Sequence, residues 1–188
     1  MNNQDPLEKS KSVGLDTSKL TKDDSVVPIY FPVSPLKLSL MSVCTFGIYE
    51  FYWFYKNWVF IKVNEQSETY PFTRAWLSIF YCFSFFKKVQ ASGKAVPDNS
   101  SIFPGFLAAG WILLTLFPVF ILPESHWLVT FFSFIFLLPV LSVVETINES
   151  VAPSHHENRN FTIWNIFGVL FGGLYFTLIL IGVFNPML

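Results

Sequence analysis

Charged residues are scarce in this chain. Of its 188 residues, 13% are Asp, Glu, Lys or Arg, whereas a soluble domain averages about 25%. Hydrophobic residues make up 52% and aromatic residues 19% of the sequence. The formal net charge of −1 provides no basic excess, so nucleic acid is not an expected partner. The composition is that of a membrane protein, and the length predicts one domain.

Cysteine and the motifs of enzymes are also scarce or missing. Cys44 and Cys82 both lie in apolar runs, where a thiol usually behaves as a small buried hydrophobe. The sequence contains no CxxC or Cys/His spacing, which argues against a disulfide framework or a zinc site. It also lacks a phosphate-binding glycine loop, HExxH and GxSxG. We therefore expect no cofactor and do not favour an enzyme.

The first part of the chain lacks the long apolar core that a signal peptide needs. Residues 1–30 mix Lys with Asp and Glu and are low in hydrophobic residues. We interpret this part as a flexible, solvated tail. A membrane domain is expected to follow it over residues 31–188.

Long uncharged runs predict an all-α, polytopic membrane bundle. About 20 mostly apolar residues are needed for a helix to cross ~30 Å of hydrocarbon. Three runs without any charge meet this requirement, and they predict helices near 103–123, 126–147 and 161–184. These helices should satisfy their own backbone hydrogen bonds in lipid.

Two earlier helices are expected near 36–58 and 72–90. The first has the length to cross but carries Glu50, and the apolar part of the second is only about 22 Å long as a helix. The second helix either crosses thinly or is re-entrant, with Lys87 and Lys88 reaching toward the surface. The prediction is therefore five membrane helices, of which four or five span the bilayer.

The distribution of Lys and Arg favours one orientation. With five crossings and the tail inside, three of the 12 positive residues lie outside (Lys56, Lys62 and Arg74) and nine lie inside. If the second helix does not cross, the tail lies outside and the split is seven inside to five outside. A third arrangement folds both early helices back into the inner leaflet and puts all 12 inside. We favour the first arrangement, and the third stays open.

Two stretches of the chain resemble each other weakly. Residues 63–76 read "VNEQSETYPFTRAW" and residues 147–164 read "INESVAPSHHENRNFTIW", so each has Asn-Glu, a polar elbow, Phe-Thr and a Trp. Such repeats frame a central site in many transporters, although matches this short also arise by chance. Five crossings put the two elbows on opposite sides of the membrane. If both early helices fold back into the inner leaflet, the two elbows lie on the same side of the membrane. The paired residues are candidate functional residues: Asn64, Glu65, Asn148 and Glu149.

Several motifs together resemble a known family. They are "FPVSPLKL", "TFGIYEFYWFYKNW", "YPFTRAW", "VETIN" and "NRNFTIWNIFGVLFGG". This set is similar to a family of small multi-span bacterial membrane proteins defined as a domain of unknown function, with the core G-[IL]-Y-x-x-Y-W-F-Y-K. The resemblance covers residues 31–184. It implies a bacterial inner-membrane protein and carries over no activity or catalytic residue.

Glu50 is the main candidate for chemistry. Ionisable groups within membrane helices are costly and often functional. No residue three or four positions from Glu50 is cationic, so an ion-pair partner must come from another element. Because Lys56 marks the nearby helix end, we interpret Glu50 as solvated at the interface and the aromatic residues around it as a belt that sets helix depth. The alternative is a proton, cation or substrate site that includes Tyr49 and Trp53.

Other polar groups are weaker candidates. Glu145 and Glu149 lie one helical turn apart beside Asn148, where they either bind a cation or a basic partner or are simply solvated. The loop "SHHEN" offers His155, His156 and Glu157 as weak metal ligands, but adjacent residues seldom converge on one ion. We therefore expect no specific metal site.

Glycines mark the expected helix contacts. Gly168, Gly172 and Gly173 form a GxxxG pattern with one extra glycine, which lets another helix approach closely. We favour packing within the chain over self-association. Pro118 and Pro139 interrupt two apolar runs and permit kinks.

Two classes of function remain. The thin inventory of polar residues in the helices favours a structural or accessory component of a membrane assembly, because a hydrophilic path needs lining groups. Its expected partners are membrane lipids and either a second copy of the chain or a larger complex. The alternative is a transporter or channel for a small solute, lipid or ion that uses Glu50 and the polar elbows.

Overall fold

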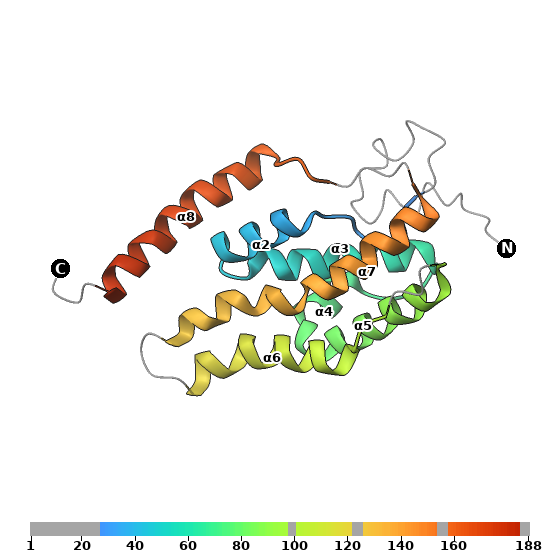
Figure 1. Cartoon of the computed structure of the whole chain (residues 1–188), viewed down its shortest axis with the longest axis horizontal. Helices are drawn as coiled ribbons and strands as arrows, with labels where there is room; N and C mark the ends of the chain where they lie inside the picture. The colour runs from blue at the N-terminus through green and yellow to red at the C-terminus, as the bar shows by residue number, and fades with distance from the viewer. Residues whose placement is uncertain (1–26, 98–100, 122–125, 154–157, 185–188) are drawn as a thin grey trace.

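The computed structural model describes residues 27–97, 101–121, 126–153 and 158–184 (Figure 1). This part of the chain is helical and contains no strand, which confirms the all-α prediction. The predicted tail lies almost wholly outside it. The elements are α2 (Pro35–Cys44), α3 (Ile48–Asn64), α4 (Pro71–Trp76), α5 (Ser78–Ala95), α6 (Pro104–Ile121), the 3-10 helix η2 (His126–Phe136), α7 (Leu138–Val151) and α8 (Ile163–Phe184).

The single helix predicted near 36–58 is wrong, because the chain turns back between α2 and α3. The N–H of Gly47 donates to Ser42 O at 2.8 Å and the N–H of Phe46 to Val43 O at 3.3 Å, which is the Schellman pattern that ends a helix. Phe46 and Gly47 have φ of 55° and 81°. Gly47 adopts this conformation freely, whereas Phe46 is strained by it.

Two further predicted helices are also divided. The helix expected near 72–90 is α4 and α5, which meet at Leu77. The helix expected near 126–147 starts as η2 and continues as α7, with Pro139 in the first turn of α7. Proline is tolerated there because the first N–H groups of a helix have no partner within it. Pro139 therefore lies at a junction between two helices.

Among the described residues, two stretches are long and apolar enough to cross a membrane, Leu128–Val151 and Ile163–Gly182. The first is partly buried inside the molecule, whereas no residue in the tested window of the second is buried. A shorter apolar helix covers Pro104–Leu116. These lengths suggest association with a membrane, and they do not support five crossings.

Figure 1 shows α6 running alongside η2, while α7 packs against α5. Helix α8 packs mainly against α2, and its Phe176 ring also lies 5.3 Å from the Phe131 ring of η2. The core between α3, α5 and α6 is aromatic. Phe54 lies 5.1 Å from Trp111 between ring centroids, and Trp53 lies 5.4 Å from Phe85. All four side chains are buried. The predicted aromatic belt is therefore wrong for Trp53 and Phe54, which form the core.

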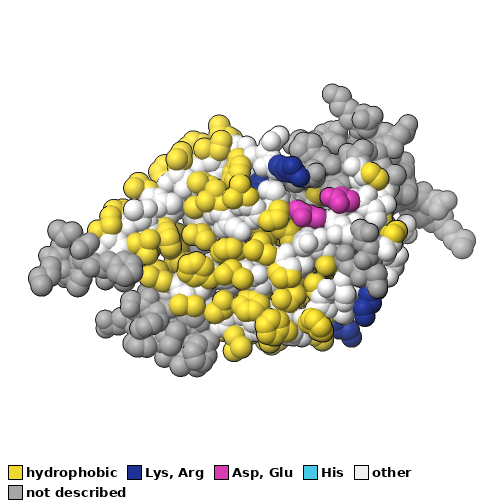
Figure 2. All heavy atoms as spheres, in the orientation of Figure 1, with side chains coloured by type: hydrophobic (Ala, Val, Ile, Leu, Met, Phe, Trp, Pro, Cys, Tyr) yellow, Lys and Arg dark blue, Asp and Glu magenta, His cyan; other side chains and the backbone are white. Residues whose placement is uncertain are grey.

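Charged and apolar side chains separate along the molecule. Figure 2 shows hydrophobic side chains over α8 and the middle of the visible face, whereas the charged groups lie toward the end where α7 finishes and α8 begins. The exposed hydrophobic residues include a long series on α8: Ile163, Trp164, Ile166, Phe167, Leu170, Phe171, Leu174, Tyr175, Leu178 and Ile181.

Candidate functional site

Glu50 lies inside the bundle, in the first turn of α3. Only 2% of it is exposed. Trp111 Nε1 of α6 donates to Glu50 Oε2 at 2.6 Å, and Ser133 Oγ of η2 donates to the two carboxylate oxygens at 2.9 and 3.1 Å. The interpretation of Glu50 as a solvated interfacial residue is therefore wrong, because protein groups from two other helices surround its carboxylate.

A second hydroxyl lies beside this carboxylate. Ser42 of α2 is completely buried, and its Oγ is close to Glu50 but outside the geometry of a formed hydrogen bond. Trp111, Ser133 and Ser42 are all neutral, so their contacts supply no cation to Glu50. We call Glu50 and these three residues the Glu50 cluster. Its members come from four helices, and the hydrogen bonds of the carboxylate join three of them, α3, α6 and η2.

The members of this cluster other than Glu50 were not predicted from the sequence. Trp111 and Ser133 are 61 and 83 residues away from Glu50 along the chain. The available signal was weak: Ser133 is the only polar residue in the run "FFSFIF". An isolated hydroxyl in a long apolar run usually satisfies a local carbonyl, so only the packing of η2 against α3 reveals its partner.

Tyr49 and Trp53 were predicted to accompany Glu50. Both are buried, but their described contacts are with aromatic rings. The Tyr49 ring lies 5.5 Å from that of Tyr52, and Trp53 packs edge-on against Phe85. The structure therefore places these two residues in the core and does not bring their polar atoms to the carboxylate.

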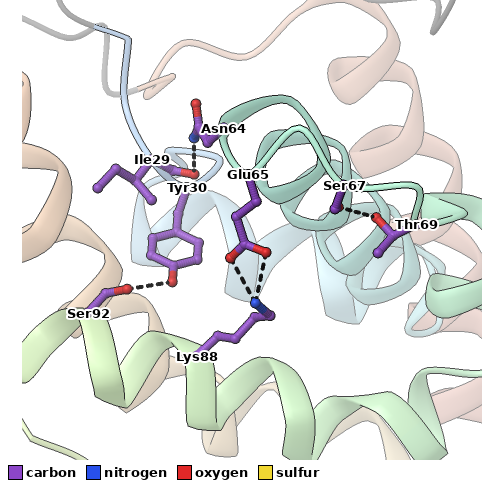
Figure 3. A network of polar contacts seen from close by, with 8 residues as sticks. All are labelled: Ile29, Tyr30, Asn64, Glu65, Ser67, Thr69, Lys88 and Ser92. Carbon is purple, nitrogen blue, oxygen red and sulfur yellow. Dashed lines mark hydrogen bonds and ion pairs between the residues drawn. The ribbon is translucent and has the colours of Figure 1, made fainter.

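The asparagines of the two elbows bind one short segment near the start of the described chain. Asn148 of α7 exchanges two hydrogen bonds with the Tyr30 backbone, at 2.9 and 3.0 Å. Asn64 of α3 donates to Ile29 O at 2.9 Å (Figure 3), and Asn57 accepts from Phe31 N at 3.1 Å. Because Ile29 and Tyr30 are consecutive residues, the two elbows lie at the same end of the molecule.

The Glu65 side chain forms a polar contact at this end. Figure 3 shows it paired with Lys88 of α5, at 2.7 and 2.9 Å, next to the Tyr30 hydroxyl, which lies 3.0 Å from Ser92 Oγ. Burial raises the pKa of the Tyr30 phenol, Ser92 acts in the opposite direction and the charge of Glu65 adds to the increase. The partly exposed ion pair contributes little to stability.

The polar residues at the end of α7 are divided between the interior and the surface. Asn148 is fully buried, Glu145 is half-buried and Glu149 is exposed. In the described ranges, no three His, Cys, Asp or Glu side chains lie close enough together to hold a metal. The loop residues His155, His156 and Glu157 lie outside those ranges.

Lys37 is a buried cation that the sequence analysis did not identify as important. Its Nζ donates to Asn160 O at 2.8 Å and to Asn158 Oδ1 at 3.0 Å, and it lies 5.8 Å from the centre of the Phe161 ring. With its amide turned, Asn165 offers a further acceptor at 3.1 Å. Burial lowers the pKa of Lys37. This residue ties the start of α2 to the segment that leads into α8.

The glycines of α8 face α2. A Cβ on Gly172 would lie 1.7 Å from Cys44 O, a backbone atom, and one on Gly168 would lie 3.5 Å from the Met41 side chain. Gly173 faces Cys44 Sγ at 3.8 Å by the same measure. The prediction that these glycines pack within the chain is confirmed, because the end of α2 fills the space that they leave.

Comparison of the chain with protein-family models, curated proteins and solved structures finds no match. The resemblance of the motif around Glu50 to a bacterial membrane family therefore stays a prediction.

Proposed function

We propose that this chain is a structural or accessory component of an assembly in the bacterial inner membrane. One observation carries the proposal: among the described residues, the buried charged and amide side chains bind other parts of the same chain. Asn57, Asn148 and Lys37 hold backbone groups, and Glu50 accepts from two helices. A hydrophilic path would need such groups to face water or a solute.

The proposal includes a topology with three crossings, formed by α6, by η2 with α7, and by α8. In this topology α2 and α3 form one re-entrant hairpin, and α4 and α5 fold back on the same side. Asn64 and Asn148 support this arrangement, because both bind the segment at Ile29 and Tyr30. The end of α2 meets Gly172, about 14 Å along α8 from Ile163. The hairpin would thus reach roughly the middle of the hydrocarbon layer.

The charges support the same topology. It places all 12 Lys and Arg on one side of the membrane, and the positive-inside rule makes this the cytoplasmic side. Five crossings would leave Lys56, Lys62 and Arg74 outside. In the structure the Arg74 guanidinium lies 4.4 Å from the Trp58 ring centre, where the stem of a snorkelling side chain would cover apolar surface.

Cysteine labelling tests the topology. In a variant with Cys44→Ala and Cys82→Ala, single cysteines at Gln66 and Arg159 should react with a membrane-impermeant maleimide from the same side. A cysteine at Ser125 should react from the other side and serves as the control. Labelling of positions 66 and 159 from opposite sides of the membrane would contradict this topology and support the arrangement with five crossings.

Photo-crosslinking in cells tests the accessory function. A crosslinking residue at the exposed Leu170 of α8 should capture another protein chain, whereas the same residue at the buried Leu141 should not. Purification in mild detergent should recover the same partner or a stable homo-oligomer. Capture of lipid alone, together with a monomeric purified protein, would overturn the proposal.

The second candidate is transport of a small solute, lipid or ion. It is favoured by one observation, the complete burial of Glu50 within an apolar bundle, because such carboxylates often mark an ion or proton path. Purified protein in liposomes should then show a flux that Glu50→Gln abolishes while helical content is retained. An equal flux in the variant would exclude a role for Glu50 in transport.

A further inference from the structure

The Glu50 cluster contains an acid with no described cation beside it. An ionised carboxylate removed from water loses a large hydration energy unless charges or hydrogen bonds replace it. The cluster supplies hydrogen bonds from Trp111 and Ser133, and the position of Glu50 in the first turn of α3 adds the favourable end of the helix dipole. Burial therefore favours the neutral acid, while these donors favour the ionised one.

Charged and titratable groups on the surrounding helices lie elsewhere. On α2, Lys37 is bound at the opposite end of the helix by Asn158 and Asn160, and Cys44 faces α8. The sequence of α6 contains no titratable residue, and that of η2 contains only His126, seven residues from Ser133. Tyr49 of α3 packs against Tyr52, and Tyr175 of α8 packs against Phe46.

The hydrogen-bonding capacities of the cluster are unequal. An indole N–H can only donate, whereas a serine hydroxyl can donate and accept. Trp111 and Ser133 already donate to Glu50, but the buried Ser42 hydroxyl has no partner. A buried hydroxyl without a partner is costly. It would be satisfied by donating to the ionised Glu50 carboxylate, so Ser42 acts in the same direction as Trp111 and Ser133.

We propose that Glu50 reversibly binds one proton inside the helix bundle. The carboxylate takes the proton from a hydronium ion, so that one O–H bond of hydronium breaks, one carboxyl O–H bond forms and a water molecule is released. In the ionised form, Trp111 and Ser133 hold the charge. This inference goes beyond the accessory function and does not depend on it.

Infrared spectroscopy of the full chain in lipid nanodiscs tests the proposal. The C=O stretching band of a protonated carboxyl should grow as the pH falls from about 10 to about 4, and its Glu50 component should be missing in Glu50→Gln. Glu65→Gln is the matched control, because Glu65 is exposed at the opposite end of α3 and its loss should leave the Glu50 component in place.

Two substitutions should raise the midpoint of this band by different amounts. Ser42→Ala removes a hydroxyl that can donate to the ionised form and should raise the midpoint by about one pH unit or less. Trp111→Phe removes a donor to the ionised form and should raise it by about one to two pH units. Thr130→Val removes another buried hydroxyl without a described partner, three residues before Ser133 on η2, and should leave the midpoint unchanged.

Three results would overturn the proposal. A band with no Glu50 component, or one that is constant over the whole pH range, would show that protonation is not reversible. A midpoint that is unchanged by Trp111→Phe in a protein with wild-type circular dichroism would show that the titrating group is not the carboxyl bound by Trp111. A midpoint that moves when choline replaces Na⁺ would identify a metal cation site instead, whereas independence of Na⁺ supports proton binding.

Discussion

The hairpin of α2 and α3 and the helix α8 are both apolar, but they use their side chains in opposite ways. In α3 the large aromatic residues Trp53, Phe54 and Trp58 are fully buried. In α8 the large residues Trp164 and Phe171 are exposed, and the small residue Gly172 makes the internal contact. Hydrophobicity alone therefore does not distinguish a core helix from one whose solvent is lipid.

Truncating a core aromatic residue should have the largest effect. Trp53→Ala should lower the free energy of unfolding by about 3–5 kcal/mol, because it leaves a cavity between α3 and α5. Unfolding of the purified protein in mixed micelles, followed by circular dichroism, would measure this loss. Phe171→Ala on the exposed side of α8 is the matched control and should change it by less than about 0.5 kcal/mol.

Enlarging the small residue of α8 should have the next largest effect. Gly172→Leu places a side chain against the Cys44 carbonyl, and we expect a loss of about 3 kcal/mol, at the upper end for overpacking, because a backbone atom cannot move aside easily. Gly182→Leu has open space around it and should have no such effect. Equal thermal stabilities of the two variants would contradict the close contact of α2 and α8.

Asn148→Ala should cost about 2 kcal/mol. It leaves the buried N–H and C=O of Tyr30 without their partner. Asn64→Ala, at the partly solvated end of α3, should cost less, because water can replace its bond to Ile29 O. Limited proteolysis near residue 30 should be faster in the Asn148 variant than in the Asn64 variant. The reverse order would show that α3 and not α7 holds the segment.

Removing the surface ion pair should have the smallest effect. Lys88→Ala should change the free energy of unfolding by less than about 1 kcal/mol, since both Lys88 and Glu65 are partly exposed. The effect should shrink further in high salt. A thermal denaturation series at two salt concentrations would check this, and a loss comparable to that of Asn148→Ala would contradict it.

The sequence predicted the helices that consist of one long uncharged run. The boundaries of α6 and α8 lie within two residues of those expected from hydropathy. The division of the helix near 36–58 was missed, because Thr45, Phe46 and Gly47 sit inside an apolar segment whose average hydropathy hides the turn. Gly47 was a usable signal, since glycine is common just after a helix end.

Glu50 was identified from the sequence as an unusual residue, but its environment was not. A carboxylate next to tyrosines and a lysine is compatible with either water or a protein interior. Its partners depend on how α6 and η2 pack against α3, which local patterns do not encode. The Asn-Glu repeat gave no sign of its contacts in the fold: its asparagines bind the backbone of Ile29 and Tyr30 at one end of the molecule.

The hydrogen bonds between Asn148 and the Tyr30 backbone have a consequence for the order in which the protein folds. Asn57 lies 26 residues from Phe31, whereas Asn148 lies 118 residues from Tyr30. Contacts between residues far apart in the sequence carry a larger entropic cost of loop closure. The contact between Asn148 and Tyr30 cannot form until α7 has been synthesised. The hydrogen bond between Asn57 and Phe31 can therefore form as soon as α3 has been synthesised. The hydrogen bonds between Asn148 and Tyr30 form only after the second half of the protein has been synthesised.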